Sequence, residues 1–359
     1  MQKFTEQRKN WYRLILSCML LMVGLTGCNI PKTPQQPISP TQDISQLVVT
    51  ATAEIVPTFT PIPDPVKVLL VAADDANPGI LELIRSGIQS LPEGQAELTE
   101  TTSFSADQIS DEIDAVILTK TPENLSEIAG RFPQTKFVTI GKITQNLQNV
   151  WTIRYDPAFE TFLAGYAVAL CAYDWRGAGL LSNDSPLLGA RAQEVFLNGA
   201  QYFCGTCVSS IAPFVAFPLS VSLPSAAGPQ EWVAGMDQIQ SNYIYTYFVS
   251  REAANDIVYQ KILSLDVNVI GVDDPPAGMD SKWLAGIRID LGGAINQILA
   301  ADPAVQPAGL VIPELDIRVG SVAGTFNEGK KTDLQKLYAD LISGMVSPYD
   351  PQPADTYTK

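Results

Sequence analysis

The stretch Val66-Lys67-Val68-Leu69-Leu70-Val71 decides the fold. It is a short, nearly all-apolar run of the kind that parallel sheets bury on both faces. Residues 80–88 follow it with apolar side chains at helical spacing. Two more buried strands are predicted at 115–118 and 136–140, with a helix at 125–132 between them. Strands that alternate with helices predict a parallel α/β layer.

The same alternation appears again further along the chain. Helices are predicted at 157–173, 188–199 and 253–263, and strands at 179–181, 243–249 and 267–272. The remaining segments are extended runs at 284–289 and 309–319, with helices at 291–300 and 333–344. Two α/β lobes followed by short return segments predict a bilobal, hinged clamp. Ligands of open α/β sheets bind outside the carboxyl ends of the strands, so both lobes can face one cleft.

The length of 359 residues exceeds what one compact core accommodates and suits two domains. We expect lobe 1 at 66–153 with a return segment at about 273–305. Lobe 2 is expected at 154–272 with a return segment at about 306–345, followed by a flexible tail at 346–359.

The first residues predict export. Residues 1–13 are polar and basic, residues 14–25 are apolar but too short to span a bilayer comfortably, and Leu25-Thr26-Gly27-Cys28 resembles the bacterial lipobox. The resemblance implies a signal peptide at 1–27 and an acylated Cys28. The alternative is an ordinary signal peptide with an incidental cysteine. With its eight prolines, the segment at 28–65 is expected to be a semi-rigid tether. We therefore expect an extracytoplasmic protein anchored to the cell membrane by lipid.

Composition excludes several functions. The formal net charge is −15, so the chain lacks a basic footprint for nucleic acid. It contains no histidine, which removes Ser-His-Asp and Cys-His catalysis. We expect no enzyme activity and no cofactor. An enzyme would need a carboxylate pair such as Asp74 and Asp273 across the cleft.

The cysteines predict a structural disulfide. Cys204-Gly205-Thr206-Cys207 has redox-motif spacing, but it trails a predicted helix, whereas redox motifs open one. Outside the cytoplasm a structural bridge is preferred, either Cys204–Cys207 or one of these with Cys171. No cysteine spacing supports a metal site.

One family resembles the central part of the chain. The segments that carry the resemblance are 136–141, 149–156, 162–170, 177–181, 196–200 and 269–273. They are similar to the basic membrane protein family, the substrate-binding lipoproteins of ABC importers, some of which capture purine nucleosides. The similarity covers roughly 66–345 and is strongest at 136–200 and 267–290. It implies a type I periplasmic-binding fold with an interlobe cleft.

Two candidate ligand-binding residues follow from this resemblance. Asp273 ends a predicted strand, and in the family the corresponding carboxylate accepts hydrogen bonds from sugar hydroxyls. Its alternative role is that of a loop or helix-capping acid. Arg288 stands where the family has a basic residue near the cleft; the alternative is a surface alternation with Asp290.

The other candidates lie at loops and strand ends. The family's first loop usually carries an aromatic residue that covers the nucleoside, whereas here Asp74, Asp75 and Asn77 offer only polar groups. Asp156, at the first predicted crossing between lobes, either caps a helix or contacts ligand. The possible stacking residues are Phe104 and Phe248, just beyond predicted strands; either could instead belong to the core.

These observations predict a lipid-anchored solute-binding protein of an ABC importer. It would capture a small polar ligand, a nucleoside among the options, and pass it to a membrane permease. The alternative is a ligand-sensing surface lipoprotein that keeps the fold without transport.

Overall fold

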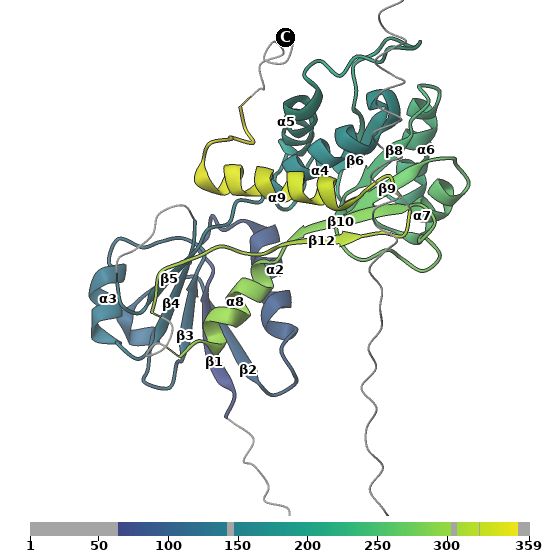
Figure 1. Cartoon of the computed structure of the whole chain (residues 1–359). Coiled ribbons are helices and arrows are strands. Elements are labelled where there is room, and N and C mark those ends of the chain that lie inside the picture. Colours follow the sequence, from purple (N-terminus) through teal and green to yellow (C-terminus); the bar gives the residue numbers. More distant parts are fainter. Residues whose placement is uncertain (1–63, 142–146, 303–306, 323, 351–359) are drawn as a thin grey trace, which may run out of the picture. The chain divides into compact units, whose positions relative to one another are not determined.

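The computed structural model describes residues 64–141, 147–302, 307–322 and 324–350. The predicted signal peptide, Cys28, nearly all of the tether and most of the tail lie outside the described residues. Within these ranges no helix combines the length and the apolar character needed to cross a bilayer. The described chain forms two sheets with helices around each (Figure 1).

The first sheet is parallel throughout and has the order β11-β5-β4-β3-β1-β2. Its strands are β1 (Val66–Val71), β2 (Ala96–Thr101), β3 (Ala115–Leu118), β4 (Lys136–Ile140), β5 (Val150–Ile153) and β11 (Leu310–Val311). The helices of this lobe are α2 (Pro78–Gln89), α3 (Leu125–Arg131) and α8 (Leu291–Ala300). The central strands β1 and β3 are almost fully buried, as their apolar runs predict.

The second sheet has the order β12-β10-β9-β8-β6-β7, and only β12 runs antiparallel. Its strands are β6 (Gly177–Ser182), β7 (Leu219–Leu223), β8 (Thr246–Val249), β9 (Asn268–Gly271), β10 (Trp283–Ile289) and β12 (Leu315–Val319). The helices of this lobe are α4 (Ala158–Cys171), α5 (Ala192–Cys204), α6 (Pro229–Gln240), α7 (Asp256–Leu263) and α9 (Glu328–Ser343). The predicted α/β fold of two lobes, each a sheet flanked by helices, is confirmed.

The elements that the sequence patterns missed are β2, β7 and α6. Strands β2 and β7 are the outer strands of their sheets, and both are largely half-exposed. An edge strand needs no continuous apolar run, so β2, with the sequence Ala-Glu-Leu-Thr-Glu-Thr, gives no signal. Helix α6 buries only Trp232 and Met236 of its side chains, which is too narrow a stripe to stand out.

The return segments differ from the expectation. Strand β10 was expected in lobe 1 but pairs with β9 in the second sheet. Strand β11 was expected in lobe 2 but pairs with β5 in the first sheet. The chain therefore passes between the sheets after β5, after β10 and after β11. Only strand pairing decides these memberships, because every segment involved is short and apolar.

Helices α4 and α5 pack against each other at unusually close range. A Cβ atom on Gly165 would lie 1.9 Å from the carbonyl oxygen of Phe196, and one on Gly199 would lie 1.9 Å from the carbonyl oxygen of Phe162. Glycine is thus required at both positions, because any side chain would collide with the backbone of the other helix. This contact explains the Phe-Leu-Ala-Gly-Tyr and Phe-Leu-Asn-Gly-Ala segments.

The structure resolves the cysteine alternatives. Cys204 and Cys207 form a disulfide at the end of α5, and Cys171 keeps a free thiol. Burial raises the pKa of Cys171 to about 11, with Lys330 opposing that change. The disulfide spans a short turn at the start of the loop that leads to β7.

Candidate functional site

Charged side chains gather at the carboxyl edge of the second sheet. Arg251 follows β8, Asp273 follows β9, and Arg288 is the penultimate residue of β10. These three strands are parallel neighbours or next neighbours, so their carboxyl ends meet at one edge. This edge is where an open α/β sheet binds its ligand.

Glu160 of α4 holds the Arg251 side chain in place. Its Nη1 atom donates to Glu160 Oε1 at 2.6 Å and its Nη2 atom to Oε2 at 3.3 Å. The buried carboxylate also accepts the backbone N–H of Ile289 at 3.2 Å. Burial acts to lower the pKa of Arg251, but the charge and hydrogen bond of Glu160 outweigh it and raise the pKa above its ordinary value. Arg251 is therefore held rigidly and fully charged.

Asp273 bridges the two arginines. Its Oδ2 lies 4.0 Å from Arg251 Nε, and its Oδ1 lies 3.5 Å from Arg288 Nη1. On its far side Arg288 donates to Asp316 Oδ2 at 3.0 Å, and these two residues are direct partners across β10 and β12. Because the Asp273 side chain is 59% exposed, it can still accept hydrogen bonds from a ligand.

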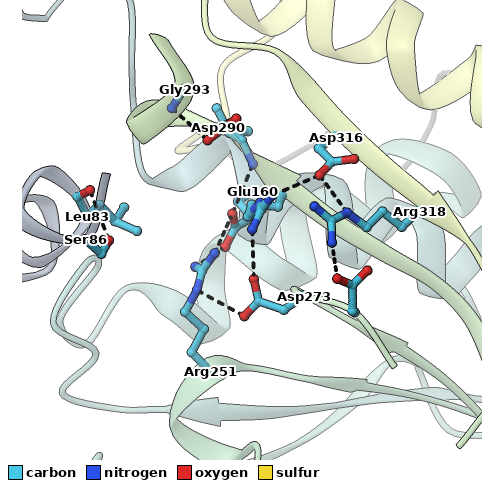
Figure 2. Close-up of polar contacts among 12 residues, drawn as sticks. Leu83, Ser86, Glu160, Arg251, Asp273, Asp290, Gly293, Asp316 and Arg318 are labelled. Atoms are coloured by element: carbon cyan, nitrogen blue, oxygen red, sulfur yellow. Dashed lines mark hydrogen bonds and ion pairs between the residues drawn. The ribbon is translucent and has the colours of Figure 1, made fainter. Parts of the chain in front are cut away.

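The alternation of charge continues beyond Asp316. Arg318 donates to Asp316 at 2.8 Å and also pairs with Asp274. Figure 2 shows this arrangement. We call it the charge chain: Glu160, Arg251, Asp273, Arg288, Asp316, Arg318 and Asp274. Each arginine in it lies between two carboxylates, and with four carboxylates to three arginines the chain carries a net charge of −1.

A cavity of about 620 Å³ lies beside the charge chain. Arg251, Asp273 and Arg288 form one wall, and α2 and α8 form the other. The two helices approach so closely that a Cβ on Gly87 would lie 2.5 Å from the Cα of Gly292. The wall contributed by the helices consists of Glu82, Leu83, Ser86, Gly87, Ser90, Asp290, Leu291, Gly292, Gly293 and Asn296. The volume of the cavity falls within the range typical of small-molecule sites.

Two polar atoms in the lining are buried without a partner in the described part of the chain. They are Nε of Arg288, which can only donate, and Oδ1 of Asn296, which can only accept. The amide nitrogen of Asn296 is used by the carbonyl of Gly87 at 3.0 Å, so its oxygen is fixed in place. An unsatisfied buried donor or acceptor costs about 1–3 kcal/mol.

The first loop makes contacts other than those expected. Asp74 and Asp75 are exposed, and Asp75 forms an ion pair with Lys120 at 2.7 Å. Asn77 caps α2 by accepting the N–H of Ile80 at 3.1 Å, and its amide donates to the carbonyl of Leu187 at 2.8 Å. Asn77 thus links the loop after β1 to the segment after β6, and none of the three lines the 620 Å³ cavity.

The predicted aromatic and capping residues also lie apart from the cavity. Phe104 packs edge-on against Phe137 in the core of the first lobe. Phe248 is buried and stacked on Phe196, beside a small space of about 30 Å³ at the ends of β6 and β8. Asp156 stands before Pro157, the N-cap of α4, and accepts the N–H of Ala158 at 3.0 Å and the hydroxyl of Tyr349 at 2.6 Å. Of the predicted ligand-binding residues, the structure brings only Asp273 and Arg288 together at the cavity.

Sequence reasoning missed Glu160, Arg251 and Asp316. Glu160 stands in an otherwise apolar helix that is buried on nearly every side, and this mismatch was a usable signal. Arg251 comes directly after a buried strand, in a position as informative as that of Asp273. Asp316 could not have been found, because its pairing with Arg288 depends on the register of β10 and β12.

No family model matches the chain, and no curated protein matches it. The similar solved structures include a transcriptional activator of the comK gene from Bacillus halodurans, with 13% identity, a TM-score of 0.44, and coverage of 79% of this chain and 99% of that one. An ABC transporter solute-binding protein from Aeropyrum pernix K1 has 14% identity, a TM-score of 0.43, and coverage of 79% and 93%.

A third similar structure is GanP, a glucose-galactose binding protein from Geobacillus stearothermophilus. It has 14% identity, a TM-score of 0.40, and coverage of 72% of this chain and 98% of that one. These values are too low to carry over a ligand or a partner. The two sheets and the chain crossings between them form a two-lobed α/β fold. Membership of the basic membrane protein family stays a prediction.

Proposed function

We propose that this protein is a lipid-anchored, extracytoplasmic solute-binding protein of an ABC importer. It captures a small polar ligand, with nucleosides among the candidates, in the 620 Å³ cavity and hands it intact to a permease. The observation that carries the proposal is the charge chain along the cavity wall, with the unpartnered Nε of Arg288 and Oδ1 of Asn296 in the same lining. The anchor rests on the lipobox-like segment ending at Cys28.

The lining suits reversible binding. Arg251 and Arg288 present donors, and Asp273 and Asn296 present acceptors. The hydroxyls of Ser86 and Ser90 already donate to helix carbonyls and can accept. A neutral ligand with hydroxyl or amide groups can satisfy this mixture without leaving a buried charge unpaired. The three chain crossings between the sheets provide the hinge about which the lobes would close. Affinity then comes from ligand burial and from the shift of the population toward the closed state.

The test begins with a thermal-shift screen of the mature protein against nucleosides, sugars and amino acids. A ligand that binds the folded state raises the melting temperature by mass action, so one class should produce a selective shift. If no compound in any class raises the melting temperature, the proposed function is wrong.

Variants then assign the site. Asp273→Ala and Arg288→Lys should each weaken the identified ligand at least about tenfold, which corresponds to ~1.4 kcal/mol. Lysine keeps the charge of Arg288 but lacks the fixed Nε–H. The matched control is Asp237→Ala, because Asp237 is similarly exposed at 56% and pairs with Lys261 outside the cavity. Equal affinity in wild type and Asp273→Ala would move the site elsewhere.

A further inference from the structure

The surface of the second lobe carries an exposed aromatic region at the edge opposite the cavity. Residues 173–175 precede β6 and residues 243–245 precede β8, so both lie at the amino ends of these strands. Between them is the loop that follows α5. We call this region the aromatic tip: Tyr173, Trp175, Ile211, Phe214, Tyr243 and Tyr245, all of them exposed.

Specific contacts join several parts of the aromatic tip. The rings of Tyr173 and Tyr245 meet edge-on with centroids 5.7 Å apart. The buried Arg176 reaches across the region and donates to the carbonyl of Ile211 at 2.6 Å and to that of Asn242 at 2.8 Å. Its guanidinium also lies over the ring of Tyr243, 5.7 Å from the centroid. One arginine therefore joins the loop after α5 to the segment before β8.

A disulfide and several hydrogen bonds fix the conformation of the loop that follows α5. The Cys204–Cys207 disulfide closes its start. Asp174 accepts the backbone N–H of Ser210 at 2.8 Å and its hydroxyl at 2.6 Å, and it pairs with Arg176 at 3.3 Å. The hydroxyl of Ser209 also donates to Asp174, and this hydrogen bond, followed by those from Ser210, lowers the pKa of Asp174. The one acid of the tip is thus fully compensated, and Phe214 stands out on a fixed base with 71% of its surface exposed.

The tip is also the electrically neutral part of an acidic protein. Residues 195–230 contain no Asp, Glu, Lys or Arg, although the whole chain has a formal net charge of −15. A contiguous exposed apolar region of this kind marks an interaction surface. Tyrosine and tryptophan suit the boundary between a bilayer and water, because one end of each ring is apolar and the other polar.

We propose that the aromatic tip rests on the surface of the lipid bilayer to which Cys28 is anchored; this inference depends on the lipid anchor of the proposed function. Residues 28–63 lie between the anchor and the first described residue. Even fully extended, these ~36 residues reach no more than about 130 Å, so the bilayer stays within that distance of the folded body. Because the tether keeps the body close to the bilayer, the tip can contact the lipid even if its own affinity for lipid is low. Contact at this edge leaves the cavity edge of the second sheet free for ligand.

The experiment uses the mature, acylated protein reconstituted on phosphatidylcholine vesicles that contain brominated lipid. Bromine quenches tryptophan only at contact. Trp175 is 36% exposed, whereas Trp151, Trp232 and Trp283 are buried and provide a constant background. We expect at least about half of the Trp175 emission to be lost, since interfacial tryptophans sit at headgroup level. The variant Trp175→Phe should remove the quenched component.

A matched pair of variants locates the contact. Phe214→Trp should add a second quenched tryptophan, whereas Met345→Trp, at a site equally exposed at 74% but outside the tip, should add an unquenched one. Replacing part of the phosphatidylcholine with anionic lipid should reduce the quenching at low salt, because the acidic body is repelled.

The outcomes separate the two proposals. Protein that fails to stay on the vesicles refutes the lipid anchor. Protein that stays on the vesicles while Trp175 and Phe214→Trp remain unquenched overturns the membrane contact of the tip. A blue shift of Phe214→Trp that grows with protein concentration in the absence of vesicles assigns the tip to a second copy of the chain, and it also overturns the inference.

Discussion

The close contact of α4 and α5 makes a direct prediction about stability. In Gly165→Ala the new Cβ would lie 1.9 Å from a backbone carbonyl oxygen of the neighbouring helix. Real Cβ atoms do not approach an oxygen below about 3 Å, so the helices must separate by roughly 1 Å. A backbone atom cannot rotate out of the way as a side chain could. The whole of α5 must therefore move.

The cost follows from what the movement disrupts. Overpacking of a core costs about 1–3 kcal/mol, and a gap of ~1 Å forfeits up to half of the dispersion energy of the atoms along it. Phe162 and Phe196, which flank the contact, are fully buried and lose part of their packing. We expect Gly165→Ala to destabilise the fold by about 3 kcal/mol or more, which exceeds the effect of most single substitutions.

Urea unfolding followed by circular dichroism measures this change. The control is Gly130→Ala in α3, where the new Cβ has nothing within 4 Å and should stabilise the helix by about 0.5–1 kcal/mol. The double variant Gly165→Ala/Gly199→Ala should cost less than the sum of the single changes, because one separation of the helices relieves both collisions. If Gly165→Ala unfolds within ~0.5 kcal/mol of wild type, the close packing is not what fixes these helices.

Three further predictions concern single groups. The lowered pKa of Asp174 means that its stabilisation is fully present above the unfolded value of 3.8 and is lost as the pH falls below that value. In unfolding experiments wild type should therefore keep its advantage over Asp174→Asn at pH 5 and lose it progressively from about pH 4 downward. The pKa of Cys171 is raised from 9.0 to about 11, so the stabilisation by its neutral thiol is complete below about pH 9. The free energy of unfolding should decline by up to ~2–3 kcal/mol as the pH rises to about 11. Cys171→Ser should flatten this decline, and a parallel decline in the variant would exclude the thiol as its cause. Asn77→Ala removes both the cap of α2 and the hydrogen bond to the Leu187 carbonyl, and should lower the free energy of unfolding by about 1–2 kcal/mol. Asn77→Ser keeps a capping oxygen and should lower it by less. Equal urea midpoints for the two variants would contradict the capping role.

The sequence predicts the local elements well, and it fails where an element is defined by its neighbours. Largely buried strands such as β1 and β4, and the helix α8, were placed correctly because their apolar patterns are continuous. Edge strands β2 and β7 were missed because one side of each is free. The membership of β10 and β11 was wrong because sheet pairing is a long-range property that short apolar runs do not encode.

The candidate site divides in the same way. Asp273 and Arg288 were found from the family resemblance together with their positions on predicted buried strands, where charges are unusual. Phe104 and Phe248 were chosen by the same positional argument, yet their contacts are those of core residues. Position along the chain shows that a side chain stands near a strand end. It does not show which way the side chain turns.

The sequence by itself determined the alternation of strands and helices, the acidic charge and the absence of histidine. Each of these is a property of neighbouring residues or of composition. Only the tertiary structure decided that Glu160, Arg251 and Asp316 join the predicted Asp273 and Arg288. These residues are far apart along the chain, and the strength of an ion pair depends on distances and burial that arise only when the second sheet forms and sets the register of its strands.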